Sequence, residues 1–409
     1  MTIPVIITFC LLLLMAYLFD LSSSKTRIPS VILLLLLGWV VRQGTELLNF
    51  RLPDISAVLP FLGTIGLILI VLEGSLELEL NRSKTGLIRK SLLGALLPMI
   101  ASAFLLAYLF RYFGDYTMKE SLANAIPLCI ISSAIAIPSV RSLNSRTKEF
   151  VIYESSFSDI LGVLFFNIIT LNEVYSSRSP GYFIVLLLVI IAVSFGTTIG
   201  LSFLLSKIEH HIKFVPIILL VILIFAVSKI YHLPGLLFIL LFGLFIGNLE
   251  GMRQYKWLEQ FRPDLLKAEV KKFKELTIEA TFLVRSLFFL VFGFLMETSE
   301  ILNTKTLFWS VGIVIITFVL RAIQLKLSRL PLRPLLFIAP RGLITILLFL
   351  SIDPENQIPI VNRPLIIQVI IITALIMMAG LMVPEKKTPA IPENGSKPEE
   401  NNEPTDSPS

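Results

Sequence analysis

Long apolar runs separated by short polar connections fill almost the whole chain. Most of these runs reach the roughly 17–25 residues that a helix needs to cross the hydrocarbon core of a bilayer. Several runs are shorter or are interrupted by proline or glycine. The pattern predicts an all-α polytopic membrane protein of about thirteen transmembrane helices, over residues 2–20, 28–41, 57–76, 91–110, 121–140, 150–171, 181–206, 214–228, 233–249, 275–296, 306–325, 334–351 and 364–383.

The composition supports this prediction. Hydrophobic residues make up 55% of the 409 residues and charged residues make up 16%, whereas about a quarter of the residues in soluble domains are charged. We therefore expect one large membrane transport domain over residues 1–383. The first apolar run lacks a basic segment before it and a small-residue cleavage site after it, so we expect a retained first helix and not a signal peptide.

The cysteines and histidines argue against a structural metal centre and against an enzyme. Cys10 and Cys129 both fall in apolar runs, and two isolated cysteines make neither a disulfide framework nor a zinc site. His210, His211 and His232 all lie in short connections. We therefore expect no cofactor and no intramembrane catalysis.

Lysine and arginine are distributed unevenly between the connections. If the N-terminus is placed outside, the cytoplasmic connections and tail hold 24 of the 35 Lys and Arg residues, and the outer connections hold 8. The positive-inside rule then favours an outer N-terminus, a cytoplasmic C-terminus and an odd number of spans, in the plasma membrane of a bacterium. The same topology accounts for the formal charge of +6, so we expect the lipid bilayer as a partner and no nucleic acid.

Two polar stretches differ from the short connections. The connection from Glu250 to Ala280 is basic and amphipathic, which favours a helix lying on the cytoplasmic face over a partner-binding motif. Residues 384–409 are rich in Pro, Glu, Asn and Ser and almost free of aliphatic side chains. This composition predicts a disordered cytoplasmic tail.

Six charged residues fall in or near the apolar runs. A charge at membrane depth costs about 2.5–3.5 kcal/mol even on the lenient insertion scale, so such residues are normally paired or functional. Glu73 stands near the end of its run, which favours an interfacial side chain. The six residues are Glu73, Glu154, Asp159, Arg285, Arg321 and Arg341.

Glu154 and Asp159 share one predicted helix. Helix geometry places Glu154 on the face of Ser158, and Asp159 on the face of Ser155. The two carboxylates are about 7.5 Å apart along the axis and about 140° apart around it, so a rigid helix cannot easily present both to one small ion. The spacing favours one carboxylate paired with a cation of the protein and the other facing a cavity. The alternative is that both are salt-bridged and inert.

Two apolar runs contain helix-breaking residues. Ile130–Leu143 contains Ser132 and Ser133 followed by Pro138, and Phe337–Leu350 contains a Pro-Arg-Gly sequence. Backbone groups that proline and glycine free from a helix must face protein or a wet cavity at membrane depth. Two interrupted helices in corresponding halves of a chain point to an inverted-repeat transporter. The alternative is a pair of ordinary proline kinks in packed helices.

Taken in order, these segments resemble the monovalent cation:proton antiporter superfamily, of sodium/proton exchanger type, over most of residues 1–383. The similar segments are FLGTIGLILIVLEGSLELEL, YESSFSDILGVLFF, RSLFFLVFGFLME, FVLRAIQ and APRGLITILL. The resemblance implies an inverted-repeat antiporter fold with two discontinuous crossing helices and a homodimer. It also implies a core bundle at about 91–171 and 306–383, with a scaffold and dimer part at about 1–76 and 181–296.

The resemblance implies roles for individual residues as well. Asp159 matches the aspartate that alternately binds a proton and a monovalent cation. Glu154 matches the acidic residue that pairs with an embedded base, here Arg321. The other positions in the implied ion site are Ser132, Ser133, Ser155 and Ser158, and the other charge-compensating positions are Arg285 and Arg341.

Two positions depart from the family pattern. Ser158 stands where exchangers have Asn and where the electrogenic branch has a second Asp, and the Asp of the family's Thr-Asp-Pro segment is absent. A single ionisable carboxylate favours one-for-one, electroneutral exchange. We therefore expect exchange of protons for Na+ or K+ by alternating access, and the alternative is a cation channel or a sensor.

Overall fold

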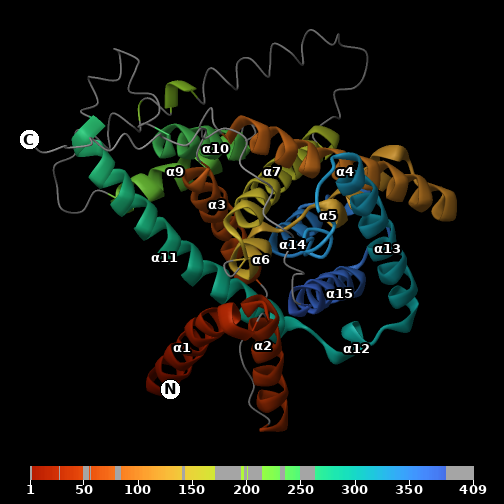
Figure 1. Ribbon diagram of the computed structural model, residues 1–409. Coiled ribbons are helices and arrows are strands. Elements are labelled where there is room, and N and C mark those ends of the chain that lie inside the picture. Colours follow the sequence, from red (N-terminus) through yellow and green to blue (C-terminus); the bar gives the residue numbers. More distant parts are fainter. Residues whose placement is uncertain are drawn as a thin grey trace, which may run out of the picture.

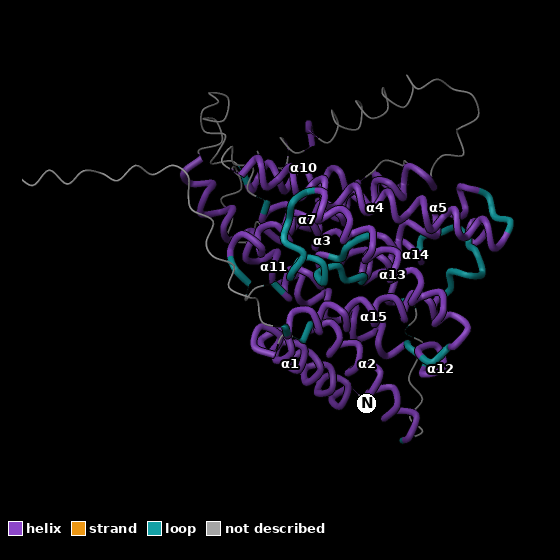
Figure 2. Tube along the Cα trace, turned by 45° about the vertical axis from the view of Figure 1, so that its right-hand side comes forward, coloured by secondary structure: helices purple, strands orange, loops and turns teal. Residues whose placement is uncertain are grey.

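The computed structural model describes residues 2–26, 28–48, 55, 57–78, 84–140, 143–170, 195–197, 200, 214–230, 235–248 and 263–383. The regular elements of these residues are all helices (Figure 2), in agreement with the all-α prediction. The predicted span 181–206 lies almost entirely outside the described residues, and so does the predicted tail at 384–409.

The helices follow the apolar runs of the sequence. Nine stretches of the described chain are long and apolar enough to cross a membrane, with α5 and α6 counted as one. The helices are α1 (Thr2–Thr26), α2 (Ser30–Leu47), α3 (Val58–Glu77), α4 (Thr85–Gly114), α5 (Met118–Cys129), α6 (Ser133–Ser139), α7 (Ser145–Thr170), α9 (Phe214–Ile230), α10 (Gly235–Gly247), α11 (Pro263–Leu295), α12 (Thr298–Ile301), α13 (Thr304–Leu327), α14 (Leu343–Leu350), η5 (Pro354–Asn356) and α15 (Arg363–Met382).

Side-chain caps fix where several helices begin. Thr117 and Glu120 form a capping box at the start of α5. Asn303 accepts hydrogen bonds from the first turn of α13, and Asn362 does the same for α15. These side chains satisfy backbone N–H groups that the first turn of a helix leaves without partners.

The helices pack in two groups that meet at α3. In one group α2 and α3 pack on α11, and α10 packs on α3 and α9. In the other group α4, α5 and α6 pack on α7, and α13 packs on α4 and α15. Because α3 also contacts α7 and α14, it joins the two groups. Figure 1 shows α11 and α13 at opposite sides of the molecule, with α3, α7 and α14 between them.

α2 and α11 cross in close contact at glycines. A Cβ atom added to Gly38 would lie 2.3 Å from the carbonyl oxygen of Leu290, and one added to Gly293 would lie 2.3 Å from the carbonyl oxygen of Leu35. Small residues allow helix backbones to approach one another closely in membrane proteins. The crossing therefore depends on the absence of side chains at these two positions.

Both predicted interruptions are present, and the second is longer than expected. In the first, Ile130–Ser132 is not helical and separates α5 from α6. In the second, only Leu343–Leu350 is helical, and the preceding chain from Arg333 to Gly342 forms turns and irregular backbone. The helical conformation predicted over 334–351 is therefore absent from the first half of this segment. Prolines at 331, 334 and 340 explain the difference, because each removes a backbone donor that a helix needs.

The connection after Glu250 also differs from the prediction. From Pro263 it continues without a break into α11, which extends to Leu295. The first part of α11 is rich in Lys, Glu, Leu and Ala, which favour helix, and Phe273 is already fully buried. The prediction of a separate surface helix is therefore wrong for this part, and residues 250–262 lie outside the described chain.

Candidate ion-binding site

The two carboxylates of α7 are both buried and face different neighbours. Glu154 is 0% exposed and Asp159 is 2% exposed. Glu154 contacts α13, whereas Asp159 contacts the first residue of α6, directly after the break between α5 and α6. The predicted pairing of one carboxylate with a cation of the protein is confirmed for Glu154, whereas Asp159 is buried against Ser133 and is not among the described residues that line the pocket next to that serine.

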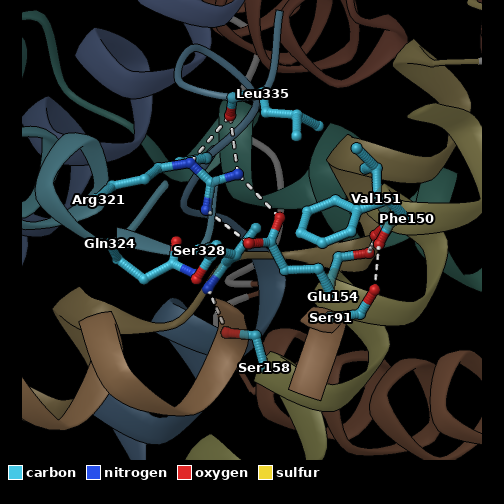
Figure 3. A network of polar contacts seen from close by, with 12 residues as sticks. Ser91, Phe150, Val151, Glu154, Ser158, Arg321, Gln324, Ser328 and Leu335 are labelled. Carbon is cyan, nitrogen blue, oxygen red and sulfur yellow. Dashed lines mark hydrogen bonds and ion pairs between the residues drawn. The ribbon is translucent and has the colours of Figure 1, made fainter. Parts of the chain in front are cut away.

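Arg321 of α13 forms a two-pronged ion pair with Glu154 (Figure 3). Its Nη1 donates to Oε1 at 3.0 Å, and its Nη2 donates to Oε2 at 2.8 Å. The carbonyl oxygen of Leu335 accepts from Nε at 2.9 Å and from Nη2 at 2.8 Å. Both charges are almost completely buried, and this geometry gives each the hydrogen bonds that a buried charge requires. This is the pair that the resemblance implied.

Gly94 of α4 leaves room for this pair. A Cβ atom at this position would lie 3.0 Å from Oε1 of Glu154 and 3.5 Å from Nε2 of Gln324. Gln324 is buried on α13 and donates to the hydroxyl of Ser328 at 3.1 Å. Neither Gly94 nor Gln324 was predicted from the sequence. A signal existed for Gln324, because it follows Arg321 by three residues and so shares its helix face.

Asp159 is held through one of its two oxygens. Ser133 donates to Oδ2 from its backbone N–H at 3.1 Å and also from its hydroxyl. Oδ1 has no hydrogen-bond partner among the described residues. A buried carboxylate oxygen without a partner is costly, so Oδ1 has unused capacity to accept a hydrogen bond.

The other predicted serines have different contacts. Ser158 accepts a hydrogen bond from the N–H of Ile131 at 2.9 Å, so α7 satisfies a backbone donor that the break leaves free. Ser155 donates to the carbonyl of Val151 on its own helix at 2.8 Å. The hydroxyl of Ser132 has no partner in the described part of the chain.

The two interruptions meet beside Asp159. The N–H of Ser132 donates to the carbonyl of Pro340 at 2.9 Å. Arg341 donates from Nε to the carbonyl of Leu128 at 2.7 Å and from Nη1 to the carbonyl of Ala339 at 3.0 Å. Leu128 is in the last turn of α5, where a cation offsets the partial negative charge of the helix end.

A small, partly open pocket lies against Ser133. Glu73 of α3 and Arg285 of α11 are on its wall, together with apolar side chains. The sequence placed Glu73 only near a span end and did not predict its position on this wall. It also gave no sign that Arg285 and Ser133 would line one space, because they are far apart in the chain.

The comparison with protein families decides the identity. The family described as sodium/hydrogen exchanger, transmembrane, matches residues 10–385. The chain belongs to the sodium/hydrogen exchanger family. This family of cation/proton antiporters consists of transporters and not of enzymes, as the sequence predicted.

Two solved structures have folds similar to this exchanger family member. Both are of the sodium proton antiporter MjNhaP1 from Methanocaldococcus jannaschii. The structure at pH 8 has a TM-score of 0.67 and 19% identity, and covers 93% of this chain and 96% of its own. The electron microscopy structure has a TM-score of 0.64 and 19% identity, and covers 93% and 95%. No curated protein matches the chain.

Proposed function

We propose that this member of the sodium/hydrogen exchanger family is a secondary active transporter that exchanges protons for Na+ or K+, with Asp159 alternately binding the proton and the cation. The observation that supports the proposal most is the geometry of Asp159. It is a buried carboxylate at a helix break, with Oδ2 held by Ser133 and Oδ1 without a partner among the described residues.

The coupling follows from the cost of burying a charge. An isolated ionised carboxylate is strongly disfavoured away from water. Asp159 is therefore stable in the bundle when it carries a proton or when a monovalent cation neutralises it, and the two states exclude one another. Glu154 is already neutralised by Arg321, so one carboxylate titrates with the cargo and the exchange is one for one.

Neutral oxygens next to Asp159 complete the proposed cation site. The hydroxyls of Ser132 and Ser133 lie at the break, and the Ser132 hydroxyl has no hydrogen-bond partner in the described chain. The Ser155 hydroxyl is one turn before Asp159 on the same helix, and a rotation about χ1 would free it from the carbonyl of Val151. Ser158 supports the site indirectly, because it holds the backbone of the break.

Alternating access would come from movement of the two helix groups against each other. The proposed core comprises α4–α7 and α13–α15, and the pair of Glu154 and Arg321 fastens α7 to α13 within it. The proposed scaffold comprises α1–α3 and α9–α11, with α2 and α11 locked at their glycine crossing. We further propose thirteen spans in two inverted repeats, an outer N-terminus, a cytoplasmic C-terminus, a bacterial inner membrane location and a homodimer.

Purified protein in liposomes with a preset pH gradient and a pH-sensitive dye tests the proposal. Addition of Na+ or K+ to the outside should dissipate the gradient, and Li+ should be included to define the selectivity. The rate should be unchanged when the membrane potential is clamped, because the exchange is electroneutral. Cation flux without proton counterflow would refute exchange and support a channel.

A further inference from the structure

Arg285 places a positive charge on the wall of the pocket that lies against Ser133, and Glu73 contributes a carboxylate to the same wall. Ser133 in turn donates two hydrogen bonds to Asp159. Arg285 is 9% exposed. In contrast to Arg321, it forms no ion pair with a carboxylate of the described chain.

The packing of α3 on α11 explains why Arg285 reaches the cavity. The two helices are antiparallel, because Gly66 faces Val284 while Leu69 accepts a hydrogen bond from Thr281 at 3.3 Å. Helical side chains lean toward the N-terminus of their own helix. Arg285 therefore extends toward the later residues of α3, which are the residues of α3 that line the cavity.

We infer that Arg285 lowers the cation affinity of the Asp159 site through electrostatic repulsion from the cavity wall. The inference rests on the proposed function, because it assumes that a cation passes Ser133 to reach Asp159. A fixed positive charge in a confined, low-dielectric space lowers the local concentration of cations. A transporter must release its cation in each cycle, and a weaker complex releases it faster.

The size of the effect follows from Coulomb's law. For two unit charges on the order of 10–15 Å apart at an effective dielectric constant of about 20–40, the interaction changes a binding constant by about 3- to 15-fold. Salt in the open part of the cavity reduces this factor. The measurement should therefore be made at low ionic strength.

Equilibrium binding of radioactive Na+ to the full-length protein in detergent at pH 9 tests the inference. The high pH keeps competition from protons low. Arg285→Gln should lower the dissociation constant by about 3- to 15-fold, and Arg285→Lys, which keeps the charge, should stay close to the parent. Lys271→Gln is the matched control, because it removes one charge from the same helix at a side chain that is 80% exposed; it should change binding less than twofold.

A second pair of variants does not depend on the folding of Arg285 variants. Ile137 lines the same cavity, so Ile137→Lys should raise the dissociation constant for Na+ relative to Ile137→Gln. Equal constants for these two variants, or for Arg285→Gln and Lys271→Gln, would overturn the inference. Exchange by the parent is measured on the same preparation: its absence would refute the proposed function, whereas a shift in binding would still support the role of Arg285.

Discussion

Replacement of Glu154 by glutamine would leave the guanidinium of Arg321 buried without a carboxylate. Both side chains are at most 2% exposed, so water cannot take over the solvation of the charge. The carbonyl of Leu335 would still accept two hydrogen bonds, and the new amide oxygen would accept one. Removal of one partner from a buried ion pair lowers the free energy of unfolding by about 3–5 kcal/mol. Because Arg321 keeps these three hydrogen bonds, we expect Glu154→Gln to lower it by about 3 kcal/mol.

Equilibrium unfolding in mixed SDS micelles measures this cost. The Glu154→Gln, Arg321→Gln and double variants form a thermodynamic cycle, for which we expect a coupling free energy of about 2 kcal/mol or more. Glu46→Gln is the matched control, because Glu46 pairs with Arg42 at 2.8 Å but is 55% exposed; an exposed pair of this kind contributes less than about 1 kcal/mol. A loss of stability for Glu154→Gln no larger than that for Glu46→Gln, or simple additivity of the Glu154→Gln and Arg321→Gln changes, would refute a strongly coupled buried pair.

Two further predictions follow from local geometry. Gly38→Ala should destabilise the protein by about 1–3 kcal/mol because the helices must separate, whereas Gly312→Ala, which meets nothing within 4 Å, should be neutral or stabilising; equal unfolding free energies would contradict this. Ser133→Ala removes a hydroxyl donor to Asp159 and should raise the KM for the cation in the liposome assay by about 10-fold, while Ser139→Ala should not. An unchanged KM for Ser133→Ala would show that its hydroxyl does not contribute.

The sequence predicts most helices because hydrophobic length and proline position are local properties. The interruption at Ile130–Ser132 was visible in the paired serines at 132 and 133 and in Pro138. The extent of the second interruption was not, because residues 334–342 are apolar enough to be taken for helix. Contacts with other segments hold their irregular backbone: Arg321 donates to the carbonyl of Leu335, and Arg341 donates to the carbonyl of Leu128.

The candidate site could be predicted only as far as it lies on one helix. The spacing of Glu154 and Asp159 showed that they face different partners. The contribution of Gly94 and the shared cavity of Glu73 and Arg285 depend on how α3, α4, α7 and α11 pack. No periodicity within one segment encodes such packing, so these features required the structure.

The role of Asp159 is the central claim, and its replacement by asparagine in the liposome assay tests it most directly. Asp159→Asn keeps the size and the acceptor oxygen but cannot alternate between a proton and a cation. We predict that it abolishes Na+- or K+-driven proton movement, while Asp353→Asn, at an exposed position outside the helix bundle, exchanges at the parent's rate. Exchange by Asp159→Asn at the parent's rate would contradict the account.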